Sequence, residues 1–277
     1  MTVDTGEVFG FLGPNGSGKS TTIRTLLDLQ RPTSGQALVL GLDARRDSTA
    51  IHRRVGYLAG DLTLFDRMTG AQLVAWCSRA RGGHDVGLTG DLVDRFDVTM
   101  DRPVRDLSKG NRQKIGLLLA FMHRPELLVL DEPTSGLDPL VQAEFEQVLR
   151  ETVQDGRTVL LSSHSLDEVQ RVADRVAIIR SGRLVVTDAV DHLRASAPRV
   201  LELTFGQAVD PSTFEQVEGA SRVAVEGSTI SLHLLGPIAP VLRLALDLDL
   251  RDLVARHADL DELFLTYYRD EGPARDD

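Results

Sequence analysis

The chain has 277 residues, of which 41 are Asp or Glu and 31 are Lys or Arg, and its net charge is −10. This length suits one large domain plus a small one, and the acidic balance argues against nucleic acid as a partner. Cys77 is the only cysteine, which excludes an internal disulfide and favours a reducing compartment. The N-terminal residues lack a secretory pattern, and the longest strongly apolar stretch, 115–122, is far too short to span a membrane. We therefore expect a cytoplasmic protein that reaches a membrane only through a partner.

The first predicted elements are a buried strand, a glycine-rich loop and a helix. The apolar run 8–12 predicts the strand, and 20–29 predicts the helix, with Ile23, Leu26 and Leu27 on one face. Between them the residues GPNGSGKS fit the phosphate-loop pattern GxxxxGKS/T. The candidate nucleotide-binding residues are Gly13, Pro14, Asn15, Gly16, Ser17, Gly18, Lys19, Ser20 and Thr21.

The chemistry of this loop predicts a nucleoside triphosphate site. Glycines let consecutive N–H groups curl around phosphate oxygens, and the helix N-terminus adds a partial positive charge. Lys19 would reach the β- and γ-phosphates, and Ser20 would ligate a magnesium ion. The alternative is a glycine-rich turn that fits the pattern by accident, and the strand–loop–helix context disfavours it.

A helical insert is expected from about residue 61 to 124. One helix opens at Thr69-Gly70 and runs through Trp76, and the segment LSKGNRQ precedes a second, apolar helix. Ser108 and Gly110 stand at the start of that second helix, where a hydroxyl, a backbone N–H and the helix dipole would favour an anion. Taken alone, Ser-x-Gly before a helix is ordinarily a cap.

Next, the run LLVLDE predicts a buried strand that ends in two carboxylates, Asp131 and Glu132. Asp131 would hold magnesium through water, and Glu132 would polarise the water that attacks the γ-phosphorus. An acidic turn at a strand end is the ordinary explanation for such a pair. Downstream of a phosphate loop, the catalytic interpretation is favoured.

The chain then alternates between helices and strands, which predicts an α/β sheet, mainly parallel, with helices on its faces. The expected elements are helix 141–154, strand 158–163, helix 166–173, strand 175–179 and a hairpin through Ser181-Gly182. His164 ends one of these strands, where a plain surface histidine is the ordinary interpretation. Asp138 precedes Pro139 and fits a helix cap.

Several of these segments together resemble one family. LSKGNRQ is similar to the LSGGQ signature of ATP-binding cassette (ABC) ATPases, in the LSKGN form common among type-2 ABC exporters. Asp131-Glu132, the segment SGLD at 135–138, and His164 follow in that family's order. The resemblance extends from about residue 5 to about residue 195.

This resemblance implies a P-loop NTPase fold with ATP and Mg2+ as cofactors. It implies that Ser108 and Gly110 contact the γ-phosphate held by a second cassette, so that a dimer encloses two ATP molecules; a homodimer is expected, and a heterodimer with a different cassette is the alternative. His164 would sense the γ-phosphate beside Glu132 and Lys19 in catalysis. The helical insert would face a membrane permease, with residues 62–65 near that contact, although ordinary packing explains those apolar residues equally well.

The chain departs from the family in two places. ABC cassettes carry further residues before the phosphate-loop strand, including an early strand and an aromatic residue that stacks on adenine. Here Met1 stands just before Thr5-Gly6-Glu7, and we interpret this as a misassigned start or a trimmed chain rather than a functional short form. The place of the family's Q-loop glutamine falls at Gly60, with Asp61 beside it. Asp61 either takes over a magnesium or water contact or is a solvated turn residue.

The C-terminal part is expected to be a separate small α+β domain. Alternating apolar and polar residues predict strands 200–205, 222–225 and 229–234, and helices 238–247 and 260–268 follow. The segment resembles the accessory domain of many type-2 exporter cassettes. The predicted organisation is a cassette at 1–197, the accessory domain at 198–270, and a disordered tail at 271–277.

Taken together, the sequence predicts the ATPase subunit of an ABC exporter, held at the inner face of the cell membrane by a separate permease. One alternative is a soluble ABC ATPase without a transport role, and another is a degenerate cassette that acts only as a structural or regulatory partner. Retention of Lys19, Asp131, Glu132 and His164 argues against degeneracy. The sequence carries no signal for the transported substrate.

Overall fold

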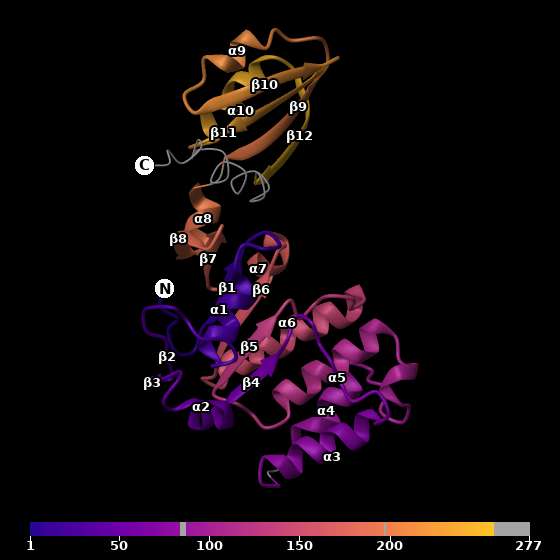
Figure 1. The fold of residues 1–277 in the computed structure, drawn as a ribbon. Helices are drawn as coiled ribbons and strands as arrows, with labels where there is room; N and C mark the ends of the chain where they lie inside the picture. The colour runs from indigo at the N-terminus through magenta and orange to yellow at the C-terminus, as the bar shows by residue number, and fades with distance from the viewer. Residues whose placement is uncertain (84–86, 197, 258–277) are drawn as a thin grey trace. The chain divides into compact units, whose positions relative to one another are not determined.

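The computed structural model of the chain describes residues 1–83, 87–196 and 198–257 (Figure 1). These residues form two compact units, divided between Asp188 and Ala189. The division precedes the boundary predicted at residue 197, and the assignment of 1–197 and 198–270 to two functional domains stays a prediction. The predicted helix 260–268 and the tail 271–277 lie outside the described residues.

A six-stranded sheet forms the centre of the first unit, in the order β4-β5-β6-β1-β7-β8. The strands are β1 (Val8–Leu12), β4 (Val55–Leu58), β5 (Leu127–Asp131), β6 (Thr158–Ser163), β7 (Arg175–Arg180) and β8 (Arg183–Ala189). The pairs from β4 through β7 are parallel, and every residue of β1 and β6 is buried, as expected for strands covered on both faces. Ser181 and Gly182, both at positive φ, form the tight turn of the predicted hairpin between β7 and β8. The predicted α/β class is therefore confirmed.

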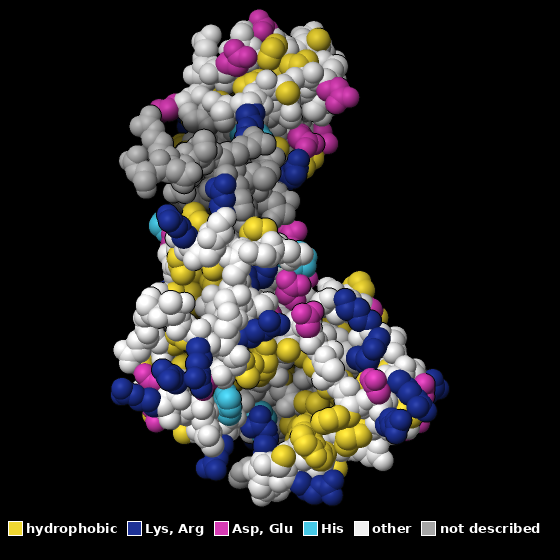
Figure 2. All heavy atoms as spheres, in the orientation of Figure 1, with side chains coloured by type: hydrophobic (Ala, Val, Ile, Leu, Met, Phe, Trp, Pro, Cys, Tyr) yellow, Lys and Arg dark blue, Asp and Glu magenta, His cyan; other side chains and the backbone are white. Residues whose placement is uncertain are grey.

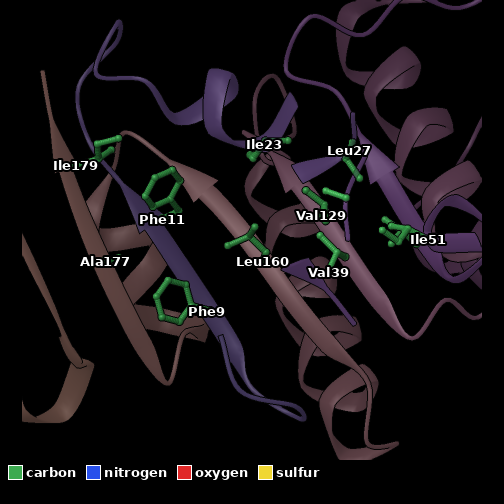
Figure 3. Packing of buried hydrophobic residues seen from close by; sticks show 12 residues of the cluster. Phe9, Phe11, Ile23, Leu27, Val39, Ile51, Val129, Leu160, Ala177 and Ile179 are labelled. Atoms are coloured by element: carbon green, nitrogen blue, oxygen red, sulfur yellow. The ribbon is translucent and has the colours of Figure 1, made fainter. Parts of the chain in front are cut away.

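The core of this unit lies between the sheet and the helices that cover it. Figure 3 shows Phe9 and Phe11 of β1 on the same side of the sheet as Leu160 and Val129 of neighbouring strands, facing Ile23. The alternation follows from the two-residue period of a strand. Other elements of this unit are α1 (Lys19–Leu26), α2 (Ser48–Arg54), α6 (Pro139–Gln154), α7 (Leu166–Val172), β2 (Leu38–Val39) and β3 (Leu42–Asp43). Helix α1 ends three residues before the predicted Leu29, where Asp28 adopts φ 53°.

The predicted helical insert is present and lies beside the sheet (Figure 1). It contains α3 (Gly70–Ala80), α4 (Gly87–Arg95), the 3-10 turn η1 (Val104–Asp106) and α5 (Lys109–Phe121). Thr69 caps α3 through a reciprocal capping box with Gln72, which explains why the helix begins where the sequence predicted it. Among the described residues, none of the helices has the length and apolar character needed to cross a membrane.

The second unit contains a four-stranded antiparallel sheet in the order β10-β11-β9-β12. Its elements are α8 (Val190–Ser196), β9 (Arg199–Phe205), α9 (Ser212–Glu215), β10 (Ala220–Glu226), β11 (Thr229–Leu234), α10 (Ala239–Asp247) and β12 (Leu250–His257). One face of the sheet packs through Leu203, Phe205 and Leu232 against Phe214 of α9 and Val241 of α10. Three of the four strands match the predicted segments, and β12 was not predicted.

Candidate functional site

The glycine-rich loop joins β1 to α1 and forms a cradle that only glycine permits. Gly16 and Gly18 adopt φ 79° and 110°, a region that other residues rarely enter. A Cβ on Gly13 would lie 2.4 Å from the carbonyl oxygen of Ile179 and 2.6 Å from Ser17 Oγ. Ser17 Oγ is itself buried without a hydrogen-bond partner among the described residues. A buried hydroxyl and a backbone cradle of this kind fit phosphate oxygens.

Lys19 lies at the centre of this cradle and is 5% exposed. Its Nζ donates to the carbonyl oxygens of Gly13 (2.7 Å) and Pro14 (3.3 Å), and lies 3.6 Å from Glu132 Oε1. A buried ammonium needs such partners, because an unpaired buried charge is costly. The arrangement places a positive charge where the triphosphate of a nucleotide would be held.

Two carboxylates follow each other at the end of β5, and their environments differ. Asp131 is 2% exposed, and one of its oxygens accepts a hydrogen bond from Ser162 Oγ on the neighbouring β6. Glu132 adopts φ 50°, and its N–H donates to the carbonyl oxygen of Ser162 at 3.1 Å. This kink ends the strand and leaves the Glu132 side chain partly exposed. The buried carboxylate suits a cation, and the exposed one suits a water molecule.

His164 completes a small cluster around Glu132. Its Nδ1 lies 3.4 Å from Glu132 Oε1, and the imidazole is 56% exposed. Strands β5 and β6 are adjacent and parallel, with Asp131 opposite Ser162, so their carboxyl ends meet at one edge of the sheet. The structure thus brings Lys19, Glu132 and His164 together from three separate segments of the chain.

A cavity of about 150 Å³ lies beside this cluster. Its lining residues are Ser20, Arg24, Gly60, Asp61, Asp131 and Glu132. A hydroxyl and a carboxylate facing one cavity are oxygen donors of the type that Mg2+ takes. Gly60 lies against the buried carboxylate, because a Cβ there would be 3.1 Å from Asp131 Oδ2. Asp61, by contrast, is 99% exposed and 3.9 Å from the guanidinium of Arg24.

Ser108 and Gly110 do not line this cavity. Ser108 caps α5 by accepting a hydrogen bond from the N–H of Asn111 at 3.2 Å, and its side chain is exposed. Gly110 touches the loop before α6, since a Cβ there would be 2.6 Å from the carbonyl oxygen of Gly136. Within one chain, therefore, the signature segment packs on the 135–138 loop and not on the phosphate loop.

Two residues of the site escaped the sequence prediction. Gln113 is 5% exposed, and its Nε2 donates to the carbonyl oxygens of Glu132 (3.3 Å) and Pro133 (3.0 Å). Ser162 bonds both acidic residues, and the available signal was a polar side chain near the end of a buried strand. Only the folded arrangement brings Gln113 to the end of β5.

The comparisons with known proteins agree with this geometry. The family model described as ABC transporter matches residues 1–135. The daunorubicin resistance ATP-binding protein DrrA3 of Streptomyces coeruleorubidus is 32% identical over 96% of this chain and 88% of its own length. The chain belongs to the ABC transporter ATP-binding family. It is therefore an ATPase that serves as the ATP-binding subunit of a transporter, and the predicted family is confirmed.

Two further similarities show what share of this chain and of each relative is matched. This chain is 36% identical to the probable multidrug ABC transporter ATP-binding protein YbhF of Escherichia coli (strain K12). The match covers 71% of this chain and 35% of that relative. A solved ATP-binding subunit of an ABC transporter superposes with a TM-score of 0.64 at 28% identity, covering 70% of this chain and 83% of that one. The similarity to solved structures thus covers most, but not all, of the chain.

Proposed function

We propose that this ABC ATPase subunit drives an exporter by binding Mg-ATP at residues 13–21 and energising a separate permease of the type-2 exporter class. The names of the relatives support export, since DrrA3 is a daunorubicin resistance protein and YbhF a probable multidrug transporter protein. The subunit is then held at the inner face of the membrane through its permease.

The observation that carries the catalytic assignment is the convergence of Lys19 Nζ and His164 Nδ1 on Glu132 Oε1, at 3.6 and 3.4 Å. In this assignment Lys19 binds the β- and γ-phosphates, and Glu132 accepts a proton from the attacking water. His164 orients Glu132 and contacts the γ-phosphate. Ser20 and Asp131 hold Mg2+, which supplies charge neutralisation between the phosphates when bound.

A second cassette completes the site in this proposal. Ser108 and Gly110 lie at the N-terminus of a 13-residue helix, and Ser108 is exposed away from the chain's own cavity. Backbone N–H groups at a helix N-terminus favour an anion. The same segment of a second copy would therefore contact the γ-phosphate, and two copies would enclose two ATP molecules.

An exposed aromatic pair on the helical insert supports the contact with a permease. Phe65 and Trp76 are 56% and 47% exposed, and their ring centroids are 5.4 Å apart at an angle of 75°. On the face shown in Figure 2, hydrophobic side chains gather where Figure 1 places α3. Exposed aromatic residues of this kind are typical anchors of protein–protein interfaces.

Glu132→Gln tests the catalytic assignment. The variant should bind Mg-ATP, form an ATP-dependent dimer and lose turnover by about 10²- to 10⁴-fold, the scale for removing a general base. Steady-state phosphate release at the wild-type rate would refute the role of Glu132. Ser108→Arg should leave ATP binding by the monomer intact and abolish dimerisation, which size-exclusion chromatography with and without ATP measures directly.

A further inference from the structure

The two edge strands of the sheet in the second unit, β10 and β12, differ in how well a further strand could pair with them. At β10 the register shifts between Ser221 and Ala224, and Arg222 adopts φ 50°. Such a bulge interrupts the row of backbone groups that another strand would need. At the other edge, the register of β12 with β9 shifts only near its start, between Leu250 and Asp252, and is regular from Asp252 to His257; among the described residues no strand covers the outer side of β12 (Figure 1).

Alternate residues of β12 direct their backbone N–H and C=O groups to the open edge of the sheet. The N–H of Leu253 donates to Asp252 Oδ1 at 2.9 Å in an exposed hydrogen bond, so this N–H points to the open edge rather than to β9. Leu253 and Ala255 therefore offer their N–H and C=O groups outward, since alternate residues of a strand face alternate neighbours. The Leu253 side chain packs on the core, which leaves Asp252, Val254 and Arg256 on the opposite, solvent-facing side.

We propose that β12 pairs antiparallel with β12 of a second copy of this chain, about a two-fold axis through Val254. In this register each Asp252 stands opposite Arg256 of the other copy, and Val254 stands opposite its twin. Leu253 and Ala255 exchange the ladder hydrogen bonds across the axis, and the N–H of Leu253 gives up its bond to Asp252 Oδ1 to do so. The pairs at 252, 254 and 256 occupy the non-hydrogen-bonded positions, where facing Cα atoms are about 4.5 Å apart and side chains meet most closely.

Charge complementarity identifies the partner as a second copy. An acidic residue, Asp252, stands two positions before Val254, and a basic residue, Arg256, stands two positions after it. A two-fold axis through Val254 therefore places opposite charges face to face on both sides of the axis. Val254 is 49% exposed, and Arg256 is anchored on the solvent face by a 3.4 Å hydrogen bond to Glu202. One strand pair is too small to hold a stable dimer alone. The pairing thus builds on the cassette dimer proposed above, which supplies a high effective concentration.

Disulfide trapping in the full chain tests the pairing. Val254→Cys in a Cys77→Ser background should form a disulfide-linked dimer, because twin residues at a non-hydrogen-bonded position lie within the Cα range of a disulfide. The matched control is Val225→Cys on β10, which is 46% exposed. Under mild oxidation, Val254→Cys should cross-link at least about 10-fold faster than the control, because the cassette dimer acts on both variants and only β12 pairing brings the twin residues within disulfide range. Circular dichroism checks that both variants are folded.

Charge reversal tests the register. Adding Asp252→Arg or Arg256→Asp to the Val254→Cys chain should slow cross-linking, and mixing the two variants should restore it as a heterodimer with two opposite-charge pairs. Glu226→Arg, on the other sheet edge, should leave the rate unchanged. Cross-linking no faster than at Val225→Cys, or unaffected by charge reversal, would overturn the proposal. ATP-driven dimerisation without this cross-link would reject β12 pairing alone, and cross-linking without ATP hydrolysis would reject the proposed function alone.

Discussion

Ser162→Ala removes a hydroxyl that serves both acidic residues at the end of β5. Ser162 is fully buried, and its Oγ donates to Asp131 and accepts from the N–H of Glu132 at 3.2 Å. Asp131 is 2% exposed, so water has little access to replace the lost bond. A hydrogen bond to a charged group contributes about 1.5–3 kcal/mol. We expect the free energy of unfolding to fall by about this amount.

The same substitution should weaken the use of Mg2+. Without the hydroxyl, the Asp131 carboxylate loses the group that fixes its orientation toward the cavity, and loss of such an outer partner typically lowers metal affinity by about 10- to 100-fold. The measurement is ATPase rate against Mg2+ concentration at saturating ATP. Ser163→Ala is the matched control, because Ser163 is equally buried and bonds a different carboxylate, that of Glu168, at 2.7 Å.

The comparison between these two variants tests whether Ser162 orients the Asp131 carboxylate for Mg2+ binding. Both should be destabilised in urea unfolding, but only Ser162→Ala should need more Mg2+ for half-maximal activity. Equal Mg2+ requirements in the two variants would show that Ser162 does not orient the carboxylate. Ser162 bonds only the backbone N–H of Glu132 and not its carboxylate, so turnover at saturating Mg2+ should change less than the Mg2+ requirement.

Three further outcomes follow from named contacts. Gly60→Ala, whose Cβ would lie 3.1 Å from Asp131 Oδ2, should raise the Mg2+ requirement by about 10-fold, the lower end of the range for changing a group that orients a metal ligand. An unchanged Mg2+ titration would contradict this. Arg95→Ala removes the guanidinium that bonds Glu144 and Glu151 between α4 and α6, and should lower the free energy of unfolding by about 1–2 kcal/mol, measured by urea unfolding and reduced in 1 M salt. Arg95 holds the pKa of the Glu151 carboxyl below its usual 4.5, so the stabilisation is complete above pH 4.5 and is lost as the pH falls through the lowered pKa. The free energies of unfolding of the wild type and Arg95→Ala should therefore converge on acidification, and a constant difference between them would contradict this.

The parts of the fold that sequence predicted well are those set by local pattern. Strand 158–163 matches β6 at both ends, because an apolar run between a turn and a helix cap has few other interpretations. Strand 229–234 matches β11 for a similar reason, since its alternation is regular. The start of α3 was predicted from Thr69-Gly70, and the capping box explains it.

The parts that sequence missed depend on contacts between distant segments. Strand β12 carries four charged or polar side chains along its length and gains its order from pairing with β9. Gln113 acquires its role only because α5 folds back to the end of β5, and no local pattern encodes that approach. At Gly60 the sequence showed only a missing glutamine, whereas the structure shows a close contact with Asp131.

The double hydrogen bond of Gln113 has a mechanical consequence. One side chain on α5 holds two successive carbonyl groups, those of Glu132 and Pro133, at 3.3 and 3.0 Å. Any tilt of the helical insert about the sheet must stretch these bonds or carry the backbone of Glu132 with it. The orientation of the insert and the position of the Glu132 backbone are thus linked by one side chain and its two hydrogen bonds rather than by a flexible loop. A force applied to the exposed face of the insert would therefore reach Glu132, the residue proposed above to polarise the attacking water, through the side chain of Gln113 alone.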